Sequence, residues 1–216
     1  MDRFKFQLIK SKELLDEIYR LRFEVYVKEN GFIPEKDCPG GKEMDKFDAY
    51  SMHFAALDEN GRLAGTARLV LNSAHGFPLE EHCRQRLLIQ DEDFPREKLA
   101  EVSRCVVDKK YRYSTGKNIP DGISSGILTP LVHGLYMAGY HESKHRNITY
   151  WCAAMETPLM RLLKTHGLGF FPMGKSFDYY GEVTPCLKIL AHTKGISAIQ
   201  SLRSYTEILT ASGKTN

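Results

Sequence analysis

The chain has 216 residues, of which 42% are hydrophobic and 26% are charged. This is the composition of an ordinary globular protein, and the length allows one domain with a sizeable core. The net charge of +3 is too small to indicate a nucleic-acid-binding protein, for which a clustered basic face is expected. No stretch rich in Pro, Gly or Ser divides the sequence, so we expect a single domain over residues 1–216.

The sequence pattern predicts neither export, nor membrane insertion, nor disulfide bonds. Charged residues interrupt the N-terminal segment MDRFKFQLIK, so we expect no signal peptide. No run of about eighteen apolar residues occurs, so we expect no transmembrane segment. The five cysteines are widely spaced and form no C-x-x-C motif, which disfavours a disulfide framework and a zinc site. We therefore expect a cytoplasmic protein with reduced thiols and no metal.

The first fifty residues predict a strand, a helix and a long loop. Alternating apolar residues favour a strand over 4–10. Ser11 is a suitable N-cap for a helix with apolar residues at helical spacing, which ends at Gly31. Residues 30–50 are rich in Pro, Gly and charge. A loop of this length inside a compact domain is typical of a functional or mobile segment.

The remaining elements alternate between strands and helices. Two strand-like runs flank Asn60-Gly61, which predicts a hairpin. Further strands and helices are expected at these positions: a short helix in 74–97, a strand within 99–112, a helix over 122–141, a strand over 148–154, a helix with Thr157 as N-cap and Pro158 as its first residue, two last strands, and a C-terminal amphipathic helix over 195–211. This order predicts an α/β fold with a mixed, largely antiparallel sheet of about seven strands, flanked by helices.

The strand LAEVSRCVV carries Glu101, Ser103 and Arg104 among its apolar residues. Burying such charges without partners costs several kcal/mol. They form either a structural ion pair or part of a functional site. Strict alternation places Glu101 and Ser103 on one face and Arg104 on the other. A β-bulge, which is common beside active sites, would bring them together.

Other charged residues gather in three short segments. They are Arg22 with Tyr26 four residues later, Glu43, Asp45 and Asp48 in EMDKFD, and Arg68 in GTARLV. The plainer interpretations are a solvated loop for the acidic residues and an architectural role for Arg22.

These motifs, in this order, resemble the acyl-homoserine lactone synthase superfamily. The segments LRFEVYVKENGF, EMDKFD, GTARLV and AEVSR carry the resemblance. The C-terminal segments WCAAMETPLMRLLKTHGLGFFPMG and FDYYGEVTPCLKIL are similar to those of exosortase-associated (PEP-CTERM) acyltransferases and long-chain N-acyl amino acid synthases. The resemblance covers most of the chain, excluding the final helix, and implies a GNAT-like acyltransferase fold. We expect one such domain over 1–216, with 195–211 as a C-terminal helix. The resemblance further implies transfer of an acyl chain from acyl carrier protein to the amine of a small molecule.

The resemblance also implies the roles of individual residues. The catalytic residues would be Glu101, Ser103 and Arg104, and the substrate-binding residues Arg22, Tyr26, Phe32, Asp45, Asp48 and Arg68. We expect Glu101 to be the general base, directly or through water. Ser103 lacks the flanking glycines of a nucleophile elbow, so its hydroxyl more plausibly bonds a neighbour.

Two interpretations of the charged residues stay open. Arg68 and Arg104 would hold a carboxylate of the acceptor or order the acidic loop. Asp45 and Asp48 would pair with Arg22 and Arg104 or bind the acceptor's ammonium.

The acyl donor is expected to be a co-substrate, with no resident cofactor. Because no Q/R-x-x-G-x-G/A phosphate loop precedes the 122–141 helix, acyl carrier protein is favoured over coenzyme A. Lys109, Lys110, Arg112 and Lys117 form either a solvated loop or a docking patch for that acidic partner.

Two other functions stay open. Lactone synthesis from S-adenosylmethionine is disfavoured, because relatives usually have Trp where this chain has Phe32. A non-catalytic carrier-protein- or lipid-binding module is the other alternative.

Overall fold

A computed structural model describes residues 3–83, 95–112 and 128–190. The predicted C-terminal helix over 195–211 and Lys117 lie outside these residues, as does the expected start of the 122–141 helix. The strands are β1 (Phe4–Leu8), β2 (Ser51–Asp58), β3 (Leu63–Leu71), β4 (Leu99–Val107), β5 (Tyr150–Met155), β6 (Phe171–Pro172), β7 (Phe177–Asp178) and β8 (Glu182–Ile189). The α-helices are α1 (Lys12–Phe23), α2 (Pro78–Cys83), α3 (Lys109–Arg112), α4 (Leu128–His145) and α5 (Thr157–Thr165).

The strands form one sheet in the order β1-β2-β3-β4-β5-β8-β6, with β7 paired to β8. All neighbours are antiparallel except β4 and β5, which run parallel. This confirms the predicted α/β class with a largely antiparallel sheet. The described sheet has eight strands rather than about seven, because the two-residue β7 carries too little sequence pattern to be predicted.

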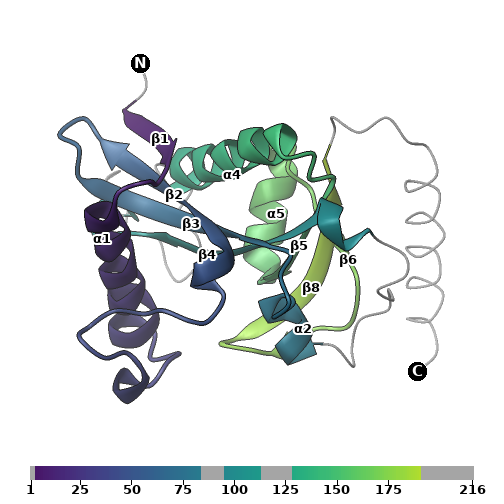
Figure 1. Cartoon of the computed structure of the whole chain (residues 1–216), viewed down its shortest axis with the longest axis horizontal. Coiled ribbons are helices and arrows are strands. Elements are labelled where there is room, and N and C mark those ends of the chain that lie inside the picture. The colour runs from purple at the N-terminus through teal and green to yellow at the C-terminus, as the bar shows by residue number, and fades with distance from the viewer. Residues whose placement is uncertain (1–2, 84–94, 113–127, 191–216) are drawn as a thin grey trace.

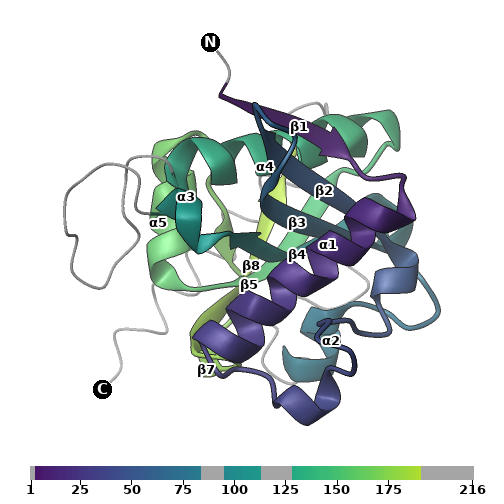
Figure 2. The same cartoon turned by 90° about the vertical axis from the view of Figure 1, so that its left-hand side faces the viewer.

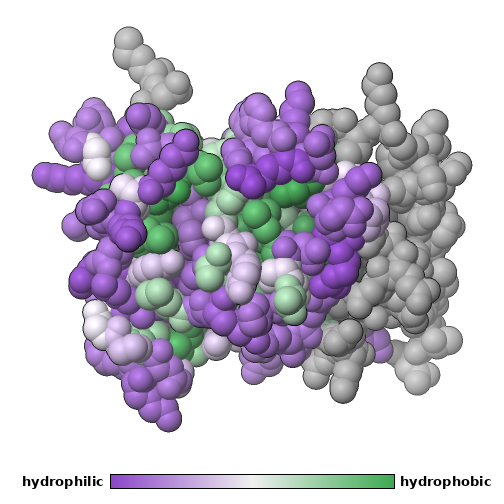
Figure 3. All heavy atoms as spheres, viewed as in Figure 1, coloured by the Kyte–Doolittle hydropathy of each residue, from purple (hydrophilic) through white to green (hydrophobic). Residues whose placement is uncertain are grey.

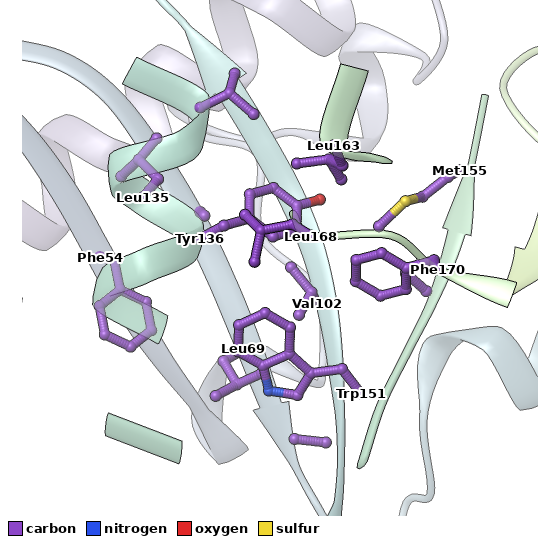
Figure 4. Close-up of a cluster of buried hydrophobic side chains, with 14 of the residues drawn as sticks. Phe54, Leu69, Val102, Leu135, Tyr136, Trp151, Met155, Leu163, Leu168 and Phe170 are labelled. Carbon is purple, nitrogen blue, oxygen red and sulfur yellow. The ribbon is translucent and has the colours of Figure 1, made fainter. Parts of the chain in front are cut away.

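Helices cover both faces of the sheet. Helix α1 crosses one face, and α4 and α5 pack on the other (Figures 1 and 2). The main hydrophobic core lies under α4 and α5, where Phe54, Leu69 and Trp151 meet Leu135 and Leu163 (Figure 4). A smaller core under α1 joins Ile18 to Ala55.

The first helix begins where the sequence predicts and then changes its winding. The Ser11 hydroxyl oxygen accepts a hydrogen bond from the Leu14 N–H at 3.2 Å, which caps the helix. After Phe23 the chain continues as a π-helix, η1 (Glu24–Glu29). It ends before Gly31, which has the positive φ that glycine tolerates best. Such π turns are often found at functional sites, and this one places Tyr26 and Phe32 beside the cleft described below.

The predicted β2–β3 hairpin is confirmed. Its turn is closed by the Asp58 carboxylate, which accepts hydrogen bonds from the backbone N–H groups of Asn60 and Arg62, both at 2.9 Å. Gly61 has a φ of 75°, the conformation for which glycine is favoured in such turns. The hairpin fixes the register of β3, which carries Arg68.

Short 3₁₀ turns complete the described elements. They are η2 (Glu35–Asp37), η3 (Asp48–Tyr50) and η6 (Arg96–Lys98). One end of α5 differs from the sequence-based expectation. Glu156, rather than Thr157, is its N-cap residue, and no side chain caps the helix there.

Candidate active site

The central strand β4 contains a bulge. Thr66 of β3 lies opposite Val106 and Arg68 lies opposite Ser103, so β4 has one residue more than β3 over this stretch. The extra residue is accommodated at Arg104, which has a φ of 49°. This resolves the question left by strict alternation, because the bulge turns Arg104 to the face that carries Glu101 and Ser103.

Packing on either side of the bulge supports this assignment. Before it, Ala100 and Val102 belong to the core under α4. After it, Val106 packs against Leu21 and Val25 on the α1 side. The alternation is thus shifted by one residue, as expected for a bulge.

Two buried arginines, one half-buried arginine and three carboxylates form an ionic network on this face. Arg22 of α1 donates to Glu43 at 2.5 Å and to both Asp48 oxygens at 2.7 and 3.1 Å. Arg68 of β3 donates to Asp45 at 2.6 Å and Asp48 at 2.9 Å. Its Nε also donates to the Ser103 hydroxyl at 3.0 Å, which accounts for that serine.

Arg104 completes the network from β4. Its guanidinium contacts Glu43 at 3.2 Å and Asp45 at 3.3 Å. Three positive charges therefore face three negative ones, and the set is neutral as a whole. The acidic segment is not a solvated loop, because Glu43 is only 2% exposed and Asp48 only 7%.

The network keeps its carboxylates ionised. Burial alone would raise the pKa of Asp48, but Arg22 and Arg68 outweigh it and hold that pKa well below the usual range. The pKa of Asp45 is also lowered, because Arg68 outweighs the effect of burial. Buried His53 lies 3.7 Å from Asp48, but burial lowers its pKa to about 4. His53 is therefore neutral at pH 7 and adds no fourth positive charge.

Glu101 is buried on the same face, and its carboxyl group lies outside this balance. The side chain is 3% exposed, and its Oε2 accepts a hydrogen bond from the Leu79 N–H at 2.8 Å. Burial raises the pKa of Glu101 to about 8, although the Leu79 N–H, Arg68 and Arg104 act in the opposite direction. This value suits a group that accepts a proton near neutral pH.

A cleft of about 450 Å³ opens where β4 and β5 part. The two strands are paired only from Leu99–Tyr150 to Glu101–Cys152. Beyond Glu101, the edge of β4 that faces β5 therefore borders open space. Figure 3 shows polar side chains around the rim of one face and apolar residues in its hollowed middle, where Figure 1 places β4 and α5.

The cleft has a polar side and an apolar side, because β4 residues alternate across the sheet. On the α1 side it is lined by Glu101, Ser103, Arg104, Tyr26, Phe32, Tyr179 and Tyr180. On the α4 side it is lined by Val102, Cys105, Val132, Tyr136, Met155 and Leu159. A polar substrate and an apolar chain can thus meet at the gap from opposite faces of the sheet.

Sequence reasoning missed the aromatic wall of the polar side. Tyr180 stacks on Phe32 with ring centroids 6.0 Å apart, and Tyr179 lies 4.4 Å from Tyr180. Burial raises the pKa of Tyr179, and the nearby Arg104 acts in the opposite direction. Tyr180 has a φ of 56°, which is a costly backbone conformation for a bulky residue. Such strained conformations cluster at functional sites. The adjacent tyrosines in FDYYGE were the signal that could have indicated this wall.

The predicted docking cations differ in their surroundings. Lys109 and Lys110 are exposed on α3. Arg112 instead borders the cleft, donating to the Val107 carbonyl at 2.7 Å and to Glu29 at 2.6 Å. Of the three predicted cations that the structure describes, the two lysines have the exposure that a docking surface requires.

Among residues 3–83, 95–112 and 128–190, no group of three metal-binding side chains occurs. No helix in this part of the chain is long and apolar enough to cross a membrane.

The mixed sheet, which parts between the parallel strands β4 and β5 and has helices on both faces, is a GNAT-like fold. Residues 21–119 match the family model described as the acetyltransferase (GNAT) domain. This span contains all three arginines and all three carboxylates of the network. A comparison with curated protein sequences found no match.

Three solved structures are similar to most of the chain. The acyl-homoserine lactone synthase LasI has a TM-score of 0.65 and 18% identity, covering 86% of this chain and 89% of its own. FeeM, an N-acyl amino acid synthase from uncultured soil microbes, has a TM-score of 0.59 and 17% identity, and the match covers 87% of this chain and 91% of FeeM. BjaI, a coenzyme-A-dependent acyl-homoserine lactone synthase, has a TM-score of 0.62 and 18% identity, and the match covers 94% of this chain and 89% of BjaI. At these identities the likeness shows the fold.

Replacing Asp48 tests whether the ionic network holds the acidic loop in place. Asp48→Asn leaves Arg22 and Arg68 short of a buried counter-charge, so we expect a loss of about 3–5 kcal/mol in the free energy of unfolding. Urea denaturation measures it. Glu142→Gln, which removes an exposed pair with Arg146, is the control and should have a far smaller effect. Equal stabilities of the two variants would contradict a structural network.

The raised pKa of Glu101 predicts a pH-dependent stability. Between about pH 4.5, the ordinary value, and about pH 8, the unfolded chain loses this proton while the folded protein keeps it. Wild-type stability should therefore fall across this interval. Glu101→Gln removes the effect, so from pH 5 to pH 8 it should gain about 2 kcal/mol or more relative to wild type in urea denaturation. Parallel pH dependences would show that Glu101 titrates normally.

Proposed function

We propose that the protein is an N-acyltransferase. It moves a medium or long acyl chain from acyl carrier protein, or from acyl-coenzyme A, to the amine of an amino acid or related small molecule. The observation that carries the proposal is a buried Glu101, with a pKa of about 8, at the opening between β4 and β5. The description of FeeM as an N-acyl amino acid synthase supports the choice of acceptor.

The two sides of the cleft suit the two substrates. The acyl chain would lie among the apolar residues under α4, where its methylene groups leave water. The acceptor would approach along the aromatic wall, which ends at Arg104 and Glu101. The thioester carbonyl and the amine would then meet at the gap in the sheet, oriented for direct attack.

The reaction would proceed by direct transfer. Glu101 takes a proton from the acceptor's ammonium or attacking amine, and the amine nitrogen forms a bond to the thioester carbon. Backbone N–H groups of β4 beyond Glu101 would stabilise the resulting oxyanion. Collapse of this intermediate breaks the C–S bond, and the proton released from the amine neutralises the thiolate.

The arginines would act mainly by positioning in this reaction. Every one of Arg22, Arg68 and Arg104 already binds carboxylates of the acidic loop. The alternative in which they order this loop is therefore better supported than the one in which they hold a substrate carboxylate. Arg104 still lines the cleft and can place a positive charge beside the acceptor.

The donor is proposed in two forms. The missing phosphate-loop motif favours acyl carrier protein, for which exposed Lys109 and Lys110 would supply positive charge. BjaI is coenzyme-A-dependent and was solved with isopentyl-CoA, so acyl-coenzyme A is kept as the alternative. A direct comparison of the two thioesters decides between them.

The same BjaI structure contains S-adenosylmethionine, which favours lactone synthesis as a second candidate function. Lactone synthesis would release methylthioadenosine, whereas N-acylation of an amino acid would not. Phe32 stands where lactone synthases usually carry Trp, so we place this activity second.

Mass spectrometry tests the proposal. The protein is incubated with acyl carrier protein thioesters, or acyl-coenzyme A, and a pool of amino acids. We expect N-acyl amino acids with wild type and with Glu142→Gln. Glu101→Gln should lose at least about a hundredfold in rate if Glu101 is the general base.

Each negative result of this assay would contradict a different part of the proposal. Background hydrolysis alone, across all chain lengths and both donors, would contradict the acyltransferase assignment. Carrier-protein binding without turnover, unchanged in Glu101→Gln, would identify a non-catalytic binding module. A loss below about threefold in Glu101→Gln would remove Glu101 from the role of base.

A further inference from the structure

The apolar side of the cleft has an inner end as well as an outer one. Arg112 and Leu159, which line the cleft and are only half-buried, mark its outer end. At the inner end, Val102 and Tyr136 line the cleft and also line a separate void of only about 10 Å³. The void is enclosed by core residues that include Leu135 and Trp151. Tyr136 and Val102 therefore divide the open cleft from the closed core.

We propose that the ring of Tyr136 ends the acyl-chain channel and thereby sets the longest chain that the protein accepts. The inference rests on the proposed acyl transfer and names the residue that selects among its donors. The thioester lies at the gap between β4 and β5, the donor arm leaves by the outer end, and the chain runs inward until it meets Tyr136.

Packing fixes the ring in this position. Tyr136 is 3% exposed and makes edge contacts with Trp151, at 6.1 Å between centroids, and Phe170, at 6.3 Å. Figure 4 shows its ring in the middle of the core cluster, with Trp151 and Phe170 beside it. A ring that packs between two aromatic side chains cannot rotate away without disturbing a close-packed interior. It therefore acts as a wall rather than as a gate.

The shape of the ring matters more than its hydroxyl group. No hydrogen bond of the Tyr136 hydroxyl occurs among the described residues. Tyr136→Phe consequently keeps the wall and deletes only the hydroxyl group. Tyr136→Leu removes part of the wall, and Leu135→Ala opens the core next to the void without touching the cleft, so it is a matched control.

The protein contains its own reporter for the inner end of the cleft. Trp151 is the only tryptophan in the sequence and contacts Tyr136. A chain that ends against Tyr136 presses on the ring that contacts the indole, and a chain that reaches past position 136 would contact the indole itself, so both should change Trp151 fluorescence. Binding can thus be measured without turnover.

The experiment titrates saturated acyl-pantetheine thioesters, from butyryl to hexadecanoyl, against each full-length variant while Trp151 emission is recorded. Acyl-pantetheine is the part shared by both proposed donors. In wild type, affinity should rise by about fourfold with each buried methylene group and then stop rising at a limiting length. Tyr136→Leu should move that limit to longer chains by at least about one methylene, and hence raise affinity for the next chain by about fourfold. Tyr136→Phe and Leu135→Ala should keep the wild-type limit.

Thermal unfolding of each variant establishes that it is folded before titration. A folded Tyr136→Leu variant with the wild-type limit would overturn the inference. The same shift in Leu135→Ala would also overturn it, because general loosening of the core would then explain the result. If Tyr136→Leu does not fold, Tyr136→Trp provides the converse test, since a larger ring should shorten the limit and an unchanged limit would contradict the wall. If wild type binds the thioesters but never transfers the acyl chain, the proposed acyltransferase function is contradicted. The binding limits of the variants would still decide whether Tyr136 ends the channel.

Discussion

Three arginines and three carboxylates neutralise one another in the interior of this protein, and the candidate site depends on that balance. Arg22, Arg68 and Arg104 come from a helix and two strands, whereas their partners come from one acidic loop. Each ion would be costly to bury alone. Together they fix that loop against α1, β3 and β4, and they place a polar surface inside a hydrophobic sheet.

The balance also explains why Glu101 is different. Every positive charge near it is already paired with a carboxylate of the loop. Glu101 is therefore buried without a dedicated counter-ion, and it keeps its proton to about pH 8. An additional arginine without a carboxylate partner would lower the pKa of Glu101 and remove the basicity that makes Glu101 useful. The bulge turns the Arg104 guanidinium toward the acidic loop, which neutralises its charge, and still leaves Arg104 at the edge of the cleft.

Much of the fold could be predicted because local patterns are strong. Ser11 and Gly31 bound the first helix, Asn60-Gly61 marks a hairpin, and apolar runs mark the central strands. The charged motifs predicted which residues gather on one face. Their geometry could not be predicted, because a one-residue bulge has no signature in LAEVSRCVV. The adjacent tyrosines in FDYYGE are a visible signal, but their place in the aromatic wall could not be predicted, because Tyr179 and Tyr180 reach the site only when β8 folds back beside β5. The π-helix that presents Tyr26 has the same apolar spacing as an ordinary helix.

The proposed chemistry depends above all on Glu101 being a buried carboxyl group with the proton affinity of a neutral-pH base. Carbon-13 NMR of the glutamate carboxyl carbons, titrated in the folded wild-type protein and assigned by the signal lost in Glu101→Gln, measures this proton affinity. We expect a Glu101 pKa of about 8, against an ordinary value of 4.5. A signal that titrates near 4.5 in the folded protein would contradict it, because Glu101 would then be an ordinary ionised group at neutral pH.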